Sequence, residues 1–247
     1  MRMPAAISEE KPANNLASLT MSDALNRLMG ELIGQWQLSP TFKDLEQYGI
    51  RPLDRVLFYG PPGNGKTVAS QVIANKLDCP LYRVCCEALL VSSFGGTQKN
   101  IAEVLDWMAA QGTAVVLWDE CESLFPDRST AGGGECTREL VSSMQIFWQR
   151  LDRWQTPQLF VLATNLIDRI DPALSSRIEL QLEFGPPTQQ QALDVLAYWT
   201  EVFHEYGSAD WSPPMREQID RNILPESFRS LWQLISSAVR SHVCKGA

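Results

Sequence analysis

Short apolar runs alternate with helix-like segments along most of the chain. Five runs predict β-strands because each is apolar and is bounded by polar or turn-forming residues. These runs are Arg55–Tyr59, Leu81–Cys85, Ala114–Trp118, Leu159–Ala163 and Ile178–Phe184. Helical spacing of apolar residues marks the segments Lys66–Leu77, Gln98–Ala110 and Cys136–Leu151. Strands that alternate with helices predict an α/β fold, with a parallel sheet covered by helices on both faces.

The two ends of the chain have different patterns. Residues 1–15 are rich in Pro, Ala and Glu, so we expect a disordered arm there, followed by helices at about Met21–Trp36 and Ser39–Gln47. After Gly185-Pro186-Pro187 the pattern is only helical. The expected parts are an arm with N-terminal helices (1–47), an α/β domain (48–185) and a small helical subdomain (186–247).

Composition indicates where in the cell the protein is expected and which kinds of partner it is not expected to bind. The chain has no apolar run of membrane-spanning length, and its first residues lack the apolar core of a signal peptide, so the cytoplasm is the expected location. Six cysteines without a Cys-x-x-Cys pair, and only two histidines, argue against a zinc site or a disulfide framework. The net charge of −8 and the lack of a basic run argue against nucleic acid as the main partner.

Residues Gly60–Thr67 fit the phosphate-binding pattern G-x-x-x-x-G-K-[ST] at every fixed position, between a predicted strand and a predicted helix. Glycines let backbone amides wrap phosphates, and the helix N-terminus adds partial positive charge. Lys66 is expected to reach the β- and γ-phosphates, and the Thr67 hydroxyl to bind Mg²⁺. The predicted nucleotide-binding residues here are Pro62, Gly63, Asn64, Gly65, Lys66, Thr67 and Val68.

Two later strands end in polar residues, at the edge where a parallel sheet binds its ligand. Asp119 and Glu120 follow the apolar run Val115–Trp118. Asp119 is a candidate Mg²⁺ ligand, and Glu120 a candidate general base for the attacking water. Asn165 follows the next strand and is a candidate for orienting that water, although a strand-end Asn is also a common turn residue.

Together these elements resemble the AAA+ ATPase family, and its AAA-type P-loop module in particular, from Tyr48 to the C-terminus. The resemblance implies an ATPase with ATP and Mg²⁺, a five-stranded parallel sheet in the order 5-1-4-3-2, and a helical lid. Gly49 and Ile50 resemble the adenine-pocket segment that leads into the P-loop. Asp119-Glu120 resembles the Walker B pair, and Asn165 stands at the sensor-1 position.

The resemblance also implies an oligomer. The segment Asp171–Arg177 resembles the family's second region of homology, so Arg177 is the candidate arginine finger for a neighbouring subunit's site. Many members carry a second arginine three residues on, where this chain has Leu180. A guanidinium supplied by a neighbour neutralises transition-state charge and couples hydrolysis to assembly. Self-association into a ring, in the family most often a hexamer, is therefore expected.

Two further positions have balanced alternatives. Phe94 and Gly95 resemble pore loop 1, but the aromatic place of family unfoldases is Ser93 here, so Phe94 is either a polypeptide-gripping residue or a core aromatic. Arg229, at the start of the last predicted helix, is either a nucleotide-binding sensor-2 residue or a surface arginine.

Three functional classes fit these motifs. The leading one is an oligomeric motor that hydrolyses ATP and remodels a protein partner. The second is an ATP-gated assembly switch or binding module with slow hydrolysis. The third, a DNA remodeller or loader, fits less well because the chain is acidic.

Overall fold

The computed structural model describes residues 2–10, 23–38, 44–50, 53–90, 96–126, 134–150, 158–205 and 212–245. The chain divides into two compact units. The first comprises residues 1–14, 28–60 and 66–183, and the second comprises residues 15–27, 61–65 and 184–247. Among the described residues, no helix has the length and apolar character needed to cross a membrane.

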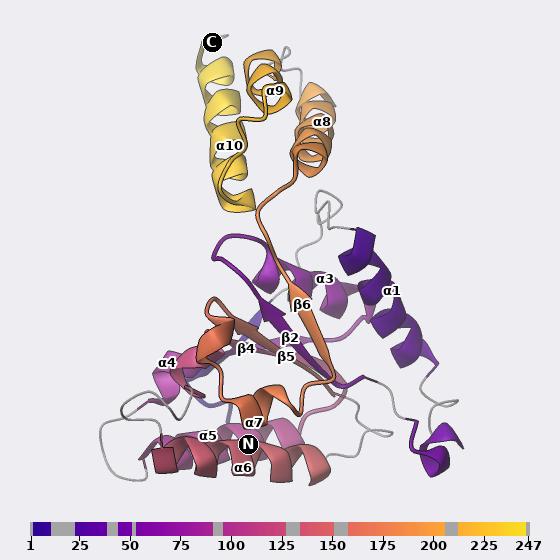
Figure 1. Ribbon diagram of the computed structural model, residues 1–247, viewed down its shortest axis with the longest axis vertical. Coiled ribbons are helices and arrows are strands. Elements are labelled where there is room, and N and C mark those ends of the chain that lie inside the picture. The colour runs from indigo at the N-terminus through magenta and orange to yellow at the C-terminus, as the bar shows by residue number, and fades with distance from the viewer. Residues whose placement is uncertain are drawn as a thin grey trace. The chain divides into compact units, whose positions relative to one another are not determined.

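A six-stranded sheet forms the centre of the first unit (Figure 1). Its order is β1-β3-β4-β5-β2-β6, and all neighbouring strands are parallel except β1 and β3. The strands are β1 (Ile7–Glu10), β2 (Arg55–Tyr59), β3 (Leu81–Cys85), β4 (Ala114–Asp119), β5 (Gln158–Thr164) and β6 (Leu180–Glu183). The predicted α/β class and the five-strand order are therefore confirmed, with one strand added.

The added strand, β1, corrects the expectation of a disordered arm over residues 1–15. Ile7–Glu10 pairs antiparallel with β3, and Ile7 stands opposite Val84 with only 5% of its surface exposed. The pairing continues beyond the strand, where the Cys85 amide donates to the Ala6 carbonyl at 2.9 Å. β1 thereby satisfies edge groups of β3 that would otherwise lack partners. Residues 11–15 lie outside the described part of the chain.

Helices cover both faces of the sheet, as predicted. The pleat sends Leu57, Val116 and Trp118 to one face, where they join the buried core with residues of α5 and α6. The other face carries α3, which contacts β3, β4 and β5. The longer helices of the chain's first part are α1 (Asp23–Gln37), α3 (Lys66–Lys76), α5 (Gly96–Ala109) and α6 (Gly134–Arg150).

Short helical turns join the strands and were not predicted, because they are too brief to show a period. They are α4 (Cys86–Leu89), η2 (Cys121–Ser123), η3 (Ile167–Arg169) and α7 (Pro172–Ser175). The helix expected from Ser39 to Gln47 begins outside the described residues, and its end is a 3₁₀ turn, η1 (Glu46–Tyr48).

The helical part of the second unit comprises α8 (Gln189–Glu205), α9 (Pro213–Asp220) and α10 (Phe228–Lys245). Its buried centre includes Leu196, Ile219 and Ile235. Trp199 of α8 lies with its ring centre 4.6 Å from that of Trp232 of α10, so aromatic packing joins these two helices.

Candidate active site

The predicted phosphate-binding loop follows β2 and ends where α3 begins at Lys66. Gly60, Gly63 and Gly65 have φ angles of 131°, 82° and 95°. Residues with a Cβ rarely adopt these angles, so the glycines make the loop conformation possible. This is the local geometry that the sequence motif requires, with backbone amides available to an anion at a helix N-terminus.

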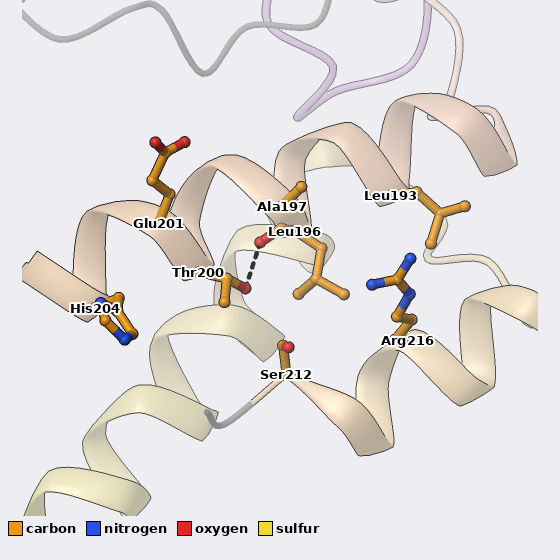
Figure 2. Close-up of a pocket in the computed structure, with 8 residues that line it drawn as sticks. All are labelled: Leu193, Leu196, Ala197, Thr200, Glu201, His204, Ser212 and Arg216. Atoms are coloured by element: carbon orange, nitrogen blue, oxygen red, sulfur yellow. Dashed lines mark hydrogen bonds between the residues drawn. The ribbon is translucent and has the colours of Figure 1, made fainter. Parts of the chain in front are cut away.

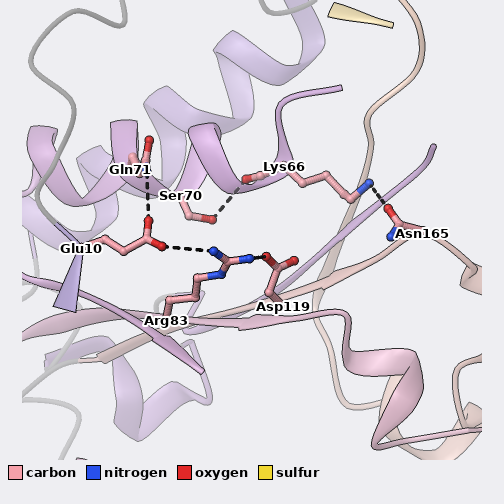
Figure 3. A network of polar contacts seen from close by, with 7 residues as sticks. All are labelled: Glu10, Lys66, Ser70, Gln71, Arg83, Asp119 and Asn165. Carbon is pink, nitrogen blue, oxygen red and sulfur yellow. Dashed lines mark hydrogen bonds and ion pairs between the residues drawn. The ribbon is translucent and has the colours of Figure 1, made fainter. Parts of the chain in front are cut away.

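The side chain of Lys66 is held inside the first unit by two acceptors. Its ammonium donates to the Gly60 carbonyl at 2.5 Å. It also donates to Asn165 Oδ1 at 2.8 Å, as Figure 3 shows. Only 7% of the surface of Lys66 is exposed, so these polar partners replace solvent around its charge. The structure thus brings together two candidates that are 99 positions apart in sequence.

Asn165 is positioned by a residue that the sequence analysis missed. Its backbone N–H donates to Oε1 of Glu122 at 3.3 Å, and Glu122 stands in the turn η2 directly after the Asp119-Glu120 pair. The other carboxylate oxygen of Glu122 is buried and has no hydrogen-bond partner within the described residues. Glu122 therefore connects the end of β4 to the end of β5.

Asp119 and Glu120 stand at the carboxyl end of β4, as predicted. Glu120 has φ 55° and ψ 43°, a left-handed conformation that is uncommon for a residue with a long side chain. Partial burial raises the pKa of its carboxyl, and the negative charges of Asp119 and Glu87 raise it further. A raised pKa suits a general base, since proton transfer is most effective when the pKa lies nearer the working pH.

Asp119 has a cationic partner that the sequence did not reveal. Oδ2 of Asp119 accepts from a guanidinium nitrogen of Arg83 at 2.6 Å. Arg83 also contacts Oε1 of Glu10 at 3.4 Å, and Oε2 of Glu10 accepts from the Gln71 amide at 2.9 Å. Figure 3 shows this row of side chains running from α3 and β1 across β3 to β4.

The remaining candidate residues make no contact with the row of side chains from Gln71 to Asp119 among the contacts described. Arg177 is exposed and follows α7, whose N-cap is the buried Asp171, with Oδ1 accepting from Ala173 N–H at 2.7 Å. Gly49 has φ 78°, and Ile50 is 50% exposed. Phe94 and Gly95 lie outside the described residues, so the pore-loop prediction is untouched by the structure.

Within the second unit, the loop segment 61–65 contacts the start of α10. The Arg229 amide donates to the Gly63 carbonyl at 3.0 Å, and Asn64 Oδ1 accepts from the Phe228 amide at 3.3 Å. Asn64 is buried, whereas Pro62 is exposed. Arg229 is exposed and contacts the loop through its backbone amide. Its sensor-2 role stays a prediction.

A separate pocket of about 400 Å³ lies between α8 and α9 (Figure 2). In it the Thr200 hydroxyl donates to the Leu196 carbonyl at 2.7 Å. Its lining residues are Leu193, Leu196, Ala197, Thr200, Glu201, His204, Ser212 and Arg216. None of the predicted site residues belongs to this set.

The donors of the first unit suit magnesium and a nucleotide rather than a tightly caged metal. Thr67 and Asp119 offer hard oxygen ligands, and Mg²⁺ in phosphate sites takes one or two protein ligands besides phosphates and water. No cluster of three or more His, Cys, Asp or Glu side chains among the described residues has a metal-binding arrangement. The positive φ of the loop glycines and the buried Lys66 ammonium fit phosphate groups.

Comparison with known proteins agrees with this geometry. Residues 56–186 match the model of the family "ATPase family associated with various cellular activities (AAA)", which covers more than half of the chain. The chain belongs to the AAA ATPase family. The family resemblance seen in the sequence is therefore confirmed.

Similar proteins share only part of their length with this chain. A 26S proteasome regulatory subunit 8 homolog of Schizosaccharomyces pombe is 30% identical over 61% of this chain and 38% of its own length. An uncharacterized AAA family ATPase of Sinorhizobium fredii is 29% identical over 72% of this chain and 52% of its own. A probable 26S proteasome regulatory subunit 10B of Caenorhabditis elegans is 27% identical over 67% of this chain and 42% of its own. The chain thus spans about half, or less, of the length of these relatives.

Proposed function

We propose that this protein hydrolyses ATP in an oligomer and uses the cycle to remodel a protein partner. The observation that carries the proposal is the hydrogen bond between Lys66 and Asn165, which follows β5, with Asp119 at the carboxyl end of the neighbouring parallel strand β4. Membership of the AAA family supports ATP as the nucleotide. Two similar proteins are named as regulatory subunits of the 26S proteasome, which supports a protein partner.

Each side chain has a separate task in this proposal. Lys66 leaves Gly60 and Asn165 to bind phosphate oxygens, which frees the Asn165 amide to orient water. Thr67 and Asp119 would hold Mg²⁺, whose chemistry is to neutralise phosphate charge. Glu120 accepts the proton of the attacking water, a task that fits its raised pKa.

Arg177 completes the site of a neighbouring copy in the same proposal. It is exposed, and the capped turn α7 fixes the backbone immediately before it. A ring, with six subunits as the expected number, would give every site one such arginine. Four described cysteines are free thiols, which supports the cytoplasm, a reducing compartment, as the location.

The test uses two variants that are each inactive for a different reason. Glu120→Gln should bind ATP without hydrolysing it, and Arg177→Ala should lose the guanidinium supplied to its neighbour. Mixing them pairs an intact Glu120 with an intact Arg177 at some interfaces, so phosphate release should recover. Arg169→Ala, at an exposed arginine in the nearby turn η3, is the matched control and should stay active.

The outcomes separate the parts of the proposal. If Glu120→Gln hydrolyses ATP at the normal rate, Glu120 is not the general base. If the two variants stay inactive when mixed, although light scattering shows that they form mixed oligomers, the proposal of a site shared between subunits is refuted. If the ATP turnover rate per subunit stays constant when the protein is diluted to monomers, Arg177 does not act in a neighbour's site.

A further inference from the structure

Arg83 lies on the same face of the sheet as the proposed magnesium ligand. In the register of the sheet Arg83 stands opposite Ser8 of β1 and opposite Leu117 of β4. Glu10 and Asp119 are each two residues further along their strands, so the pleat returns both to that face. Cross-strand diagonals of this kind are within reach of long side chains. The strand order β1-β3-β4 thus places Arg83 between two carboxylates.

The two contacts of Arg83 are unequal. The contact with Asp119 is 2.6 Å and that with Glu10 is 3.4 Å. The Asp119 side chain is 14% exposed, and the Glu10 side chain, 20% exposed, is also fixed by Gln71 of α3. Arg83 itself is 41% exposed and keeps its charge at any physiological pH. A permanently charged guanidinium therefore forms an ion pair with the carboxylate that we propose as a magnesium ligand.

Resting on the proposed function, we infer that Arg83 competes with Mg²⁺ for Asp119, and that Glu10 weakens this competition by drawing on the guanidinium from the other side. Like charges repel, so Arg83 lowers the affinity of the site for a divalent cation. Glu10 offsets part of that charge and offers Arg83 a second acceptor when Asp119 turns to the metal. Through Glu10, strand β1 becomes a positioning element of the active site.

This arrangement predicts shifts of opposite sign at two residues that contact each other. Arg83→Gln removes the competing cation and should raise the affinity for the metal. Glu10→Gln leaves Arg83 with one charged acceptor and should lower it. A merely structural role would move both variants in the same direction, because each loses the same contact. In the double variant the effect of Glu10→Gln should largely vanish, because its action requires Arg83.

The experiment measures metal binding rather than turnover. The whole chain with ADP is titrated with Mn²⁺, whose free ion gives a sharp electron paramagnetic resonance signal that is lost on binding. We expect a dissociation constant about fivefold lower for Arg83→Gln and about threefold higher for Glu10→Gln, as for partly exposed charge pairs. Both shifts should shrink as salt rises. Arg221→Gln, which breaks the exposed pair with Glu217, is the matched control and should leave the constant unchanged.

Two measurements keep failure of the inference apart from failure of the proposed function. Fluorescent ADP is first added to the unmodified protein with Mg²⁺ present, and absence of binding there would overturn the proposed function and this inference with it. If ADP binds, weaker Mn²⁺ binding by Arg83→Gln, or no shift in either variant, overturns the inference alone. Should Arg83→Gln not fold, as judged by thermal unfolding, Arg83→Lys keeps the charge and should bind Mn²⁺ within about twofold of the unmodified protein. A larger loss in Arg83→Lys would overturn the competition.

Discussion

The ammonium of Lys66 and the side-chain oxygen of Asn165 share a hydrogen bond of 2.8 Å between the start of α3 and the end of β5. The bond means that Lys66, which we propose as the phosphate-binding lysine, already has a neutral acceptor before any phosphate arrives. A phosphate, which carries charge, replaces that acceptor readily because charge-assisted hydrogen bonds are stronger than neutral ones. The pair therefore suits a lysine that must exchange partners during a cycle.

The first prediction uses the charge of residue 165. Asn165→Asp places a carboxylate on Lys66, which then competes with phosphate, so ATP should bind about five- to tenfold more weakly. Asn165→Ala removes the neutral acceptor of Lys66 and the amide proposed to orient water but adds no charge, so binding should stay within about twofold while turnover falls about 10²-fold. Fluorescent-nucleotide titration and phosphate release measure the two effects.

The control for this charge change is Asn75→Asp, at an exposed position on the same helix as Lys66. It adds the same negative charge without contact to the lysine, and it should bind ATP normally. Equal ATP affinities for Asn165→Asp and Asn165→Ala would contradict the exchange of partners at Lys66.

The second prediction concerns the loop backbone at Gly63. A Cβ there would lie 3.0 Å from Cβ of Arg229 and 3.2 Å from the Ser227 hydroxyl, on a backbone with φ 82°. Gly63→Ala should therefore lower the free energy of unfolding by about 1–2 kcal/mol, the cost of a left-handed residue, and weaken binding of ADP. Urea denaturation and fluorescent ADP measure these changes.

Gly112→Ala is the matched control, because a Cβ at Gly112 meets nothing within 4 Å. It should unfold and bind ADP like the unmodified protein. If Gly63→Ala behaved in the same way, the crowding of the loop against Ser227 and Arg229 would be refuted.

The centre of the sheet is predictable from the sequence because β4 and β5 are buried on both faces and appear as apolar runs. β4 and β5 are buried over nearly their whole length, and both are recognised to within a residue or two. β1 is not predicted from the sequence because it has four residues, two of them Glu, and carries one buried side chain, Ile7. An edge strand of this length leaves no period that a sequence pattern can detect.

The active site is predictable where a motif fixes the spacing, and it is not where pairing across strands brings residues together. Asp119 and Asn165 stand at strand ends and Lys66 at a fixed position of the loop motif, so the sequence alone names all three as candidates. Arg83 and Glu10 are 73 positions apart, and only the register of β1 on β3 makes them neighbours. The one available signal was a charged residue inside the apolar run of β3.

The third prediction concerns thiol reactivity in the first unit. Cys85 is exposed, while Cys79, Cys86 and Cys121 are buried. Burial raises the pKa of Cys79 to about 11, and burial likewise raises the pKa values of Cys86 and Cys121. The reactive form is the thiolate, so these three should stay protonated and unreactive at pH 8, and among these four cysteines iodoacetamide should modify Cys85 first.

Peptide mapping by mass spectrometry identifies the modified cysteine. In urea all four should react, because unfolding removes the burial that raises the three pKa values. Labelling of Cys79 before Cys85 in the folded protein would contradict the burial of the Cys79 thiol. Modified Cys85 stands opposite Asp119 in the sheet register, so labelling should also impair metal binding.

The fourth prediction tests whether β1 contributes to the stability of the sheet. Ile7 is 5% exposed, and its truncation to Ala leaves a gap beside Val84, so the free energy of unfolding should fall by about 2 kcal/mol. Leu90→Ala is the control, because Leu90 is 45% exposed and should change stability by less than about 0.5 kcal/mol. Urea denaturation compares the two. If Ile7→Ala is as stable as Leu90→Ala, β1 does not hold Glu10 in place, and the coupling of this strand to Arg83 loses its support.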